Sequence, residues 1–304
     1  PKEYDLFMKE VNKSFEGVGM YIGMEDNRLT VIGPIEGSPA DKAGIKKGDV
    51  IVKIDDQETS GLKVDEAVKL ISGPEGTKVK LTIERPGQDN LLEVVITRAK
   101  INLKTVSGGM VADNIGYIRM TTFAEKTTEE FKNMIKELRK NDLKGLILDL
   151  RDNPGGYLEV SVDIADYFIP QGPVVSIKSR DGQEKVYKAS GKNYLNLPVA
   201  VLINGGSASA SEILSGAIQD LQTGIIIGEK SYGKGSVQSI LNLENGAGLK
   251  LTTALYYTPS GRSIEKKGIV PDLVVKLPAN SEKDLQLEKA VEVIKERIAA
   301  AAGS

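Results

Sequence analysis

The sequence predicts two folded parts: an α/β domain with a largely parallel sheet, preceded by a smaller α+β domain of short strands and two helices. After residue 98, apolar strands alternate with helical segments, which is typical of parallel sheets. Residues 17–98 instead hold short, closely spaced apolar segments separated by turn residues. A chain of 304 residues, 40% of them hydrophobic and 27% charged, is long enough to bury two cores.

The smaller domain opens at a glycine-rich entry, Gly17–Gly23, which runs into an apolar strand. Ser38 followed by Pro39 is typical of a helix start, and Gly44 is typical of the residue after a helix end. Apolar residues recur at helical spacing in Val64–Ile71, which predicts the second helix. The remaining predicted strands lie at 29–32, 50–54, 79–84 and 92–97.

The larger domain shows the strand and helix alternation of an α/β fold. Its predicted strands lie at 115–118, 145–150, 199–203 and 225–227, and its predicted helices at 128–138, before 168, at 212–222 and at 284–300. Residues 1–16 are predicted to be helical and to belong to this larger domain. The expected divisions are therefore 1–16, 17–98, 99–278 and 279–304, the last being a C-terminal helix and tail.

The composition restricts the chemistry that the chain can perform. There is no Cys, no His and no Trp. The absence of His excludes mechanisms that need imidazole, and the absence of Cys excludes a thiolate nucleophile and thiolate metal ligands. Because 40 basic and 42 acidic residues are intermixed, nucleic acid is not an expected partner. We expect no metal and no other cofactor.

Three loops of the larger domain follow apolar strands, where α/β sheets gather functional groups. The first, Arg151–Gly156, is glycine-rich and leaves amides uncovered; a plain strand-to-helix turn is the alternative interpretation. The second, Asn204–Glu212, leads into a helix whose first free amides would face Ser209. Such amides suit a developing oxyanion. A capping box of Ser209 or Ser211 with Glu212 fits the same residues.

The third loop, Gly228–Gly235, comes close to the phosphate-binding pattern Gly-x4-Gly-Lys-[Ser/Thr]. Gly235 stands where that pattern needs a hydroxyl, and a strand is predicted at 237–241 where it needs a helix. These differences argue against nucleotide binding. A serine nucleophile without His needs another base, and a lysine amine can serve when burial lowers its pKa from ~10.4 toward ~7–8. Lys234 follows an apolar strand and lies between two glycines, although an ordinary surface lysine is the alternative.

At these loops the sequence resembles the carboxy-terminal processing proteases, also called tail-specific proteases. The shared motifs are LILDLRDNPGG at 146–156, NGGSASASE at 204–212, GKGSVQ at 233–238, YTPSGRSI at 257–264 and GIVPD at 268–272. Residues 17–98 resemble a PDZ domain in their Gly-Val-Gly entry, Ser-Pro-Ala motif and Gly-x3-Gly-Asp turn. The resemblance implies an α/β protease core, with a ClpP/crotonase-like sheet and helices, plus an inserted α+β PDZ domain.

The resemblance also implies the roles of individual residues in a serine endopeptidase. Ser209 matches the nucleophile, Lys234 the general base and Gln238 the residue that orients the lysine amine. Two backbone amides would form the oxyanion hole. These are the amide of Ala210 and that of either Gly155 or Gly156.

A PDZ domain binds a free C-terminus as an added strand and holds its carboxylate with backbone amides. The resemblance places these amides at the glycine-rich entry and the groove between the following strand and the second helix. The candidate residues are Gly17, Val18, Gly19, Met20, Ile22, Val64, Val68 and Ile71. The domain can also gate activity in this family, with Arg85 or Arg98 as candidates for the coupling; strand-end surface charges are the alternative.

The expected function is cleavage of proteins that are recognised by their C-terminal tails, with the PDZ domain selecting substrates. Expected partners are proteins or peptides with free C-termini, and the family also allows a homodimer or a regulatory protein. The resemblance implies an extracytoplasmic location, in the periplasm or on the outer face of a bacterial membrane, although no targeting segment opens the sequence. The rival interpretation is a non-catalytic PDZ adaptor, against which the presence of both Ser209 and Lys234 argues.

Overall fold

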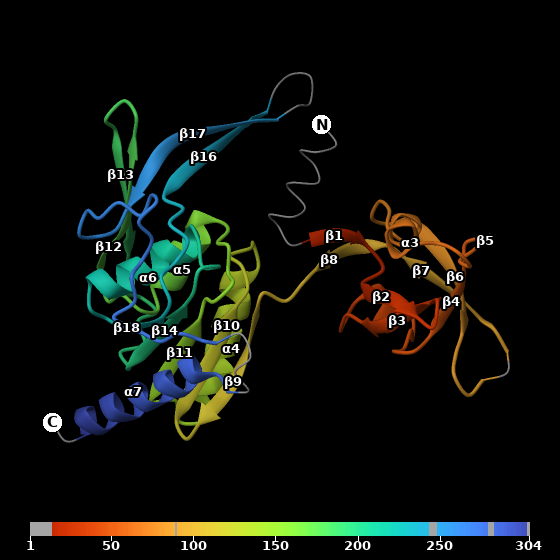
Figure 1. The fold of residues 1–304 in the computed structure, drawn as a ribbon, viewed down its shortest axis with the longest axis horizontal. Helices are drawn as coiled ribbons and strands as arrows, with labels where there is room; N and C mark the ends of the chain where they lie inside the picture. Colours follow the sequence, from red (N-terminus) through yellow and green to blue (C-terminus); the bar gives the residue numbers. More distant parts are fainter. Residues whose placement is uncertain (1–13, 89, 243–247, 279–282, 303–304) are drawn as a thin grey trace. The chain divides into compact units, whose positions relative to one another are not determined.

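The computed structural model describes residues 14–88, 90–242, 248–278 and 283–302. Its contacts divide the chain into two compact units, which Figure 1 draws in red to orange and in yellow to blue. We call Lys13–Leu103 the N-terminal unit and Lys104–Ser304 the C-terminal unit. Each unit has its own buried apolar core, so each is described separately.

The N-terminal unit begins and ends with a two-stranded sheet. β1 (Ser14–Gly17) pairs antiparallel with β8 (Ala99–Asn102), from the other end of the unit. Residues 14–16 are therefore extended, and the prediction of a helix through residue 16 is wrong for them. Pairing with a partner far along the sequence decides their conformation, which local pattern does not reveal. The rest of that predicted helix, residues 1–13, lies outside the described residues.

The main sheet of the N-terminal unit is antiparallel. Its strands, in the order β2-β3-β4-β6-β7, are β2 (Met20–Glu25), β3 (Arg28–Pro34), β4 (Val50–Ile54), β6 (Lys78–Glu84) and β7 (Leu92–Thr97), with β5 (Gln57–Glu58) paired to β4. The two predicted helices are present as α2 (Pro39–Lys42) and α3 (Val64–Ile71). Apolar residues of the strands and of both helices share one core, which makes this unit the expected α+β domain.

The C-terminal unit contains a six-stranded sheet, four of whose five pairings are parallel. The strands, in the order β18-β15-β14-β11-β10-β9, are β18 (Leu273–Val274), β15 (Ile225–Gly228), β14 (Val199–Ile203), β11 (Gly145–Asp149), β10 (Ile115–Met120) and the antiparallel β9 (Val106–Ala112). All five residues of β11 and of β14 are buried, as central parallel strands covered on both faces require.

Helices cover both faces of this sheet (Figure 1). Side chains on one face pack against α4 (Thr127–Arg139), α5 (Leu158–Ala165) and α6 (Ala210–Asp220). Side chains on the opposite face pack against α7 (Leu285–Ala302). Successive strand residues alternate between the two cores: Leu146 and Leu148 face α4 to α6, whereas Ile147 faces α7. This arrangement confirms the expected α/β core.

A second, antiparallel sheet in the order β13-β12-β17-β16 completes the C-terminal unit. Its strands are β12 (Gly172–Ser179), β13 (Glu184–Ala189), β16 (Ser236–Asn242) and β17 (Gly248–Tyr257). The sequence predicted β16 and missed the other three. β16 directly follows the Gly228–Gly235 loop, so the helix that a phosphate-binding loop requires is replaced by a strand.

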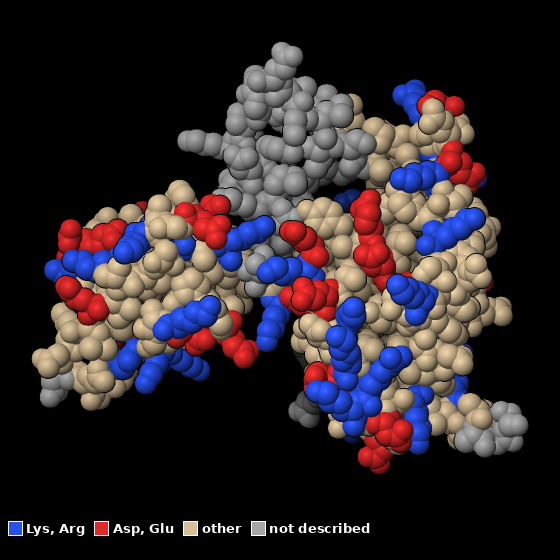
Figure 2. All heavy atoms as spheres, turned by 180° about the vertical axis from the view of Figure 1, so that it is seen from behind, with Lys and Arg blue, Asp and Glu red and all other residues tan. Residues whose placement is uncertain are grey.

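The surface shown in Figure 2 carries basic and acidic side chains interspersed on both units. Of the helices that the structure describes, none is both long and apolar enough to cross a membrane.

Candidate active site

The three loops identified from the sequence follow three neighbouring parallel strands. Arg151–Gly156 follows β11, Asn204–Ser209 follows β14, and Glu229–Gly235 follows β15. Because β14 pairs in parallel with both β11 and β15, the three loops leave the same edge of the sheet. This edge is where open α/β sheets place their ligand sites.

Ser209 occupies a sharp turn at the start of α6. Its backbone has φ 53° and ψ −113°, a conformation that a residue with a side chain seldom adopts and that requires support from its surroundings. Its amide donates to Oε2 of Glu212 at 2.8 Å, and its carbonyl accepts from the amides of Glu212 and Ile213. The turn therefore starts the helix and leaves Ser209 partly exposed at the loop edge.

The Glu212 carboxylate joins the Ser209 turn to the Lys234 loop. Glu212 is completely buried. Besides the Ser209 amide, it accepts from Ser231 Oγ at 2.5 Å, Gly233 N at 2.6 Å and Lys234 N at 2.9 Å. The amides of Ser209 and Lys234 share one acceptor, Oε2, so the two residues are held next to each other. The sequence suggested Glu212 only as a helix cap and missed this bridging role.

Further hydrogen bonds fix the Lys234 loop to its surroundings. Tyr232 N donates to Ser207 O at 3.0 Å, and Ser231 Oγ accepts from Ile269 N at 2.7 Å. Lys234 itself is partly buried. The loop is therefore anchored at Ser231 and Tyr232, on the N-terminal side of Lys234.

The glycine-rich loop lies against the Ser209 turn. A Cβ added to Gly155 would lie 2.9 Å from both Ala210 N and Ser209 Cβ, so only glycine allows this approach. Asn153, which is completely buried, connects the two loops: its carbonyl accepts from Ala208 N at 3.0 Å and Ser211 Oγ at 2.9 Å. The structure thus brings Gly155, Ala210, Ser209 and the Lys234 backbone into one region.

A buried charged cluster supports the start of the glycine-rich loop. Arg151 donates to Asp149 and to Asp284, with the closest contacts at 2.6 and 2.7 Å. Tyr117 Oη donates to the same Asp149 carboxylate at 2.7 Å. Burial, followed by the Asp149 charge, raises the pKa of Tyr117 to about 12. The Arg151 guanidinium thus lies between two carboxylates at the end of β11, and Arg119 Nη1 also lies 3.6 Å from the Asp149 carboxylate.

Some predicted site residues are placed only in part. Gln238 lies in β16 opposite Thr252, and its side chain is outside the described residues. In the N-terminal unit, Met20 and Ile22 lie on β2, an edge strand, and α3 packs beside it. Along α3 the three candidates differ in exposure. Val64 is partly buried, Val68 is 43% exposed and Ile71 is 6% exposed.

Hydrogen bonds from the start of α2 fix the glycine-rich entry of the N-terminal unit. Gly17 belongs to β1, and the carbonyls of Val18 and Gly19 accept from Ala40 N at 2.8 Å and Ser38 Oγ at 2.7 Å. Gly19 has φ 76°, and an added Cβ would lie 2.4 Å from Ser38 Cβ, which explains the glycine.

The two arginines considered for coupling are both bound within the N-terminal unit. Arg98 is 9% exposed and donates to the carbonyls of Leu70 and Ile71 at the end of α3. Arg85 donates to Asp49 at 2.7 Å through two nitrogens. Arg98 is therefore not a surface charge, whereas Arg85 is a partly exposed residue that forms an ion pair just after β6.

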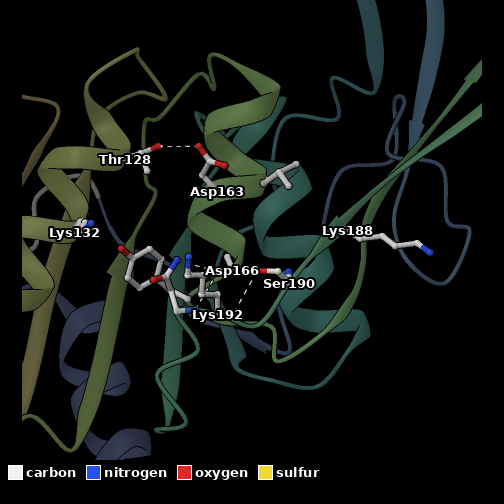
Figure 3. Close-up of a pocket in the computed structure, with 10 residues that line it drawn as sticks. Thr128, Lys132, Asp163, Asp166, Lys188, Ser190 and Lys192 are labelled. Carbon is white, nitrogen blue, oxygen red and sulfur yellow. Dashed lines mark hydrogen bonds between the residues drawn. The ribbon is translucent and has the colours of Figure 1, made fainter.

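A separate cavity of about 340 Å³ lies between α4, α5 and the segment after β13 (Figure 3). It contains none of the residues of the three loops. Its Asp166 carboxylate accepts five hydrogen bonds from Ser190, Gly191 and Asn193. The structural role of Asp166 is therefore to fix the segment after β13. Lys188 extends away from the other lining residues in Figure 3. In the part of the chain that the structure describes, no group of three acidic residues could hold a metal ion.

Comparison with known proteins agrees with the two-unit fold. The family Peptidase S41 matches residues 114–275, and the PDZ domain matches residues 30–85. A carboxy-terminal-processing protease of Bartonella bacilliformis is 46% identical over 271 residues, covering 87% of this chain and 62% of that protein. A carboxyl-terminal-processing protease of Synechocystis sp. is 37% identical over 306 residues, covering 97% of this chain and 72% of that protein.

A solved structure is also similar to this chain. A photosystem II D1 C-terminal processing protease is 32% identical, with a TM-score of 0.56, covering 95% of this chain and 78% of that one. The chain spans about six-tenths of the length of the first curated relatives that it matches, between 58% and 62%.

The fold and these matches define a class of protein, a peptidase core combined with a PDZ domain. Within that class the chain belongs to peptidase family S41, and its similar relatives are carboxy-terminal-processing proteases. The resemblance stated from the sequence motifs is confirmed.

Proposed function

We propose that this chain is a serine endopeptidase in which Ser209 attacks the peptide bond and Lys234 is the general base. The observation that carries the proposal is the buried Glu212 carboxylate, whose Oε2 accepts from the amides of both residues. A serine at a sharp, strained strand-to-helix turn and a lysine on an anchored loop are thereby joined through one atom. Such rigid placement is what general-base activation of a hydroxyl requires.

The oxyanion hole in this proposal consists of the amides of Ala210 and Gly156. The Gly155 amide already donates to Asn153 Oδ1 at 2.9 Å. Among the described residues, the amides of Ala210 and Gly156 have no hydrogen-bond partner. Ala210 is also the first residue of α6, so its amide is one that a helix leaves free and that the helix dipole favours for an anion.

The chemical steps follow from these positions. The neutral Lys234 amine takes the Ser209 proton as Oγ attacks the scissile carbonyl, and the two amides stabilise the oxyanion by about 3 kcal/mol each. The lysine then gives the proton to the leaving amine, which leaves an acyl group on Ser209. Water, deprotonated by the same amine, hydrolyses this ester and restores the serine. Gln238 is proposed to orient the lysine amine.

The N-terminal unit is proposed to select substrates by their C-terminal tails. β2 is an edge strand, so an extended tail can add beside it and fill the space next to α3. The glycine-rich entry at 17–20 precedes β2, and its amides would hold the terminal carboxylate. Binding there is further proposed to gate cleavage, and an extracytoplasmic location and a homodimer or regulatory protein partner complete the proposal.

A digestion assay tests this function. Wild type and Ser209→Ala are incubated with an unfolded model protein, with and without a peptide that ends in apolar residues. We expect cleavage by wild type only, and a rate that changes when the peptide is present. Absence of cleavage by wild type from about pH 6 to about pH 10, with peptide added, would instead favour a PDZ adaptor.

A further inference from the structure

Arg151, at the start of the glycine-rich loop, is held by two elements that are far apart in the sequence. Its side chain is 7% exposed. Nε and Nη2 donate to Asp149 at the end of β11. Nη1 and Nη2 donate to Asp284 at 2.8 and 2.7 Å. The guanidinium therefore makes a bidentate contact with each carboxylate, the strongest arrangement available to arginine.

The two carboxylates have different consequences for the loop. Asp149 lies two residues before Arg151, and because Tyr117 of β10 donates to the same carboxylate, this contact fixes the turn after β11 to the neighbouring strand. Asp284 lies 133 positions away in the sequence. Its Oδ1 also accepts from Leu287 N at 3.0 Å, which makes Asp284 the residue that caps the start of α7. Asp284 is thus the contact that ties Arg151 to a distant helix.

Gln286 reinforces the same connection. Its Oε1 accepts from Arg151 Nη1 at 3.1 Å, and its Nε2 donates to Val275 O at 2.7 Å, just after β18. It is 1% exposed. α7 itself packs on β11 and β14 through Ala290 and Ile294, so the start of the helix is a fixed reference point.

Arg151 lies five residues before Gly156 of the proposed oxyanion hole, so its position affects the position of Gly156. Asp152 N donates to Asn204 Oδ1 at 2.9 Å, and Asn153 binds the turn that carries Ser209. The backbone then reaches Gly156. A displacement of about 1 Å at a reacting group lowers a rate by about 100-fold. The first residue of this loop therefore has to be held firmly.

We propose that Asp284 is a positioning residue for the peptidase reaction: it holds the Arg151 guanidinium and, through it, the loop that presents the Gly156 amide to the oxyanion. This inference rests on the proposed function, because it assigns a role within the same site. Asp284 does not touch the substrate, and its effect is on the geometry in which the oxyanion is stabilised.

The test separates this role from helix capping. Asp284→Ser keeps a good capping residue at the start of α7 but cannot form the bidentate contact with Arg151. Asp284→Asn is the second variant, since it also caps the helix and keeps the side-chain shape. The control is Glu292→Gln on the same helix, where Glu292 pairs with Lys289 in an exposed position.

For both Asp284 variants we expect kcat to fall about 10- to 100-fold, with KM within about twofold of wild type. A peptide aldehyde, which forms an oxyanion on Ser209, should lose affinity by the same factor as kcat. A cleaved product peptide, which forms none, should bind as to wild type. Glu292→Gln should behave as wild type in all three measurements.

Two results distinguish this proposal from the proposed function. If wild type neither cleaves protein nor reacts with a fluorophosphonate that labels active-site serines, the proposed function is wrong. If wild type is active and both Asp284 variants keep its kcat and its aldehyde affinity, or lose product affinity as much as kcat, the positioning role is wrong. If one of the two Asp284 variants does not fold, the measurements on the folded one decide whether the positioning role is correct.

Discussion

Replacing Glu212 by Gln changes one atom of the carboxylate that joins the Ser209 turn to the Lys234 loop. Oε1 accepts from Ser231 Oγ and Gly233 N, and Oε2 accepts from the amides of Ser209 and Lys234. A carboxamide has an oxygen at one of these positions and an NH₂ group, which is a donor, at the other. The change keeps the side-chain shape, so its effect measures the hydrogen bonds.

The magnitude follows from which position the NH₂ group takes. At the Oε2 position it would oppose two amides, neither of which can accept. At the Oε1 position the Ser231 hydroxyl can turn, but the Gly233 amide is left without a partner. At least one buried amide is then left without an acceptor, which costs ~1–3 kcal/mol. The remaining hydrogen bonds also weaken because their acceptor is no longer charged. We expect a destabilisation of about 2–4 kcal/mol, and a fall in kcat of about 100-fold or less because both loops shift.

Scanning calorimetry and steady-state kinetics measure the two effects. The C-terminal unit should unfold about 5–15 °C lower than in wild type, while the transition of the N-terminal unit stays in place. Glu137→Gln is the control, because Glu137 pairs with Lys140 at an exposed position and its replacement should change stability by less than about 0.5 kcal/mol. An unchanged melting temperature together with an unchanged kcat in Glu212→Gln would show that the Glu212 carboxylate does not hold the two loops together.

Two further predictions concern other parts of the chain. Burial raises the pKa of Asp166, but the hydrogen bonds from Ser190 and the following amides outweigh it and leave the pKa lowered. Its stabilising contribution is therefore present above the unfolded pKa of ~3.9 and is lost as the pH falls through the lower folded value. Asp166→Asn should melt below wild type at pH 7 and approach it in acid; equal melting at pH 7 would contradict this. Val68→Lys, at a 43% exposed position of α3, should weaken binding of a peptide with an apolar C-terminus at least 10-fold without unfolding the unit, as measured by fluorescence polarisation. Val95→Lys, 58% exposed on β7 at the far edge of the sheet, should bind as wild type, and equal affinities of the two variants would exclude the groove.

The sequence predicts most of this fold because its strongest signals are local. The amphipathic helix at 127–139 is readable from its periodicity, and the buried strands at 145–149 and 199–203 from short apolar runs next to turn residues. The hairpin of β12 and β13 was missed although Asp181-Gly182 lies between two alternating segments, a usable turn signal. β1 could not be predicted in this way, since its partner lies more than 80 residues away.

The candidate site likewise contains residues that local motifs predict and residues whose contacts are distant in the sequence. Ser209, Lys234 and the glycine-rich loop have recognisable local motifs. The bridging role of Glu212 depends on a carboxylate that is buried and reaches another loop, and helix-capping residues look the same in sequence. The connection of Arg151 to Asp284 spans 133 positions and has no spacing rule. Contacts of this kind appear only once the strands have brought their loops to one edge.

The role of Lys234 as the general base is tested by measuring the turnover of an unfolded protein substrate by Lys234→Ala. We expect cleavage to fall by at least ~100-fold, because the general base is lost, while the circular dichroism spectrum and the melting temperature stay those of wild type. Cleavage at the wild-type rate by a folded Lys234→Ala protein would contradict this role.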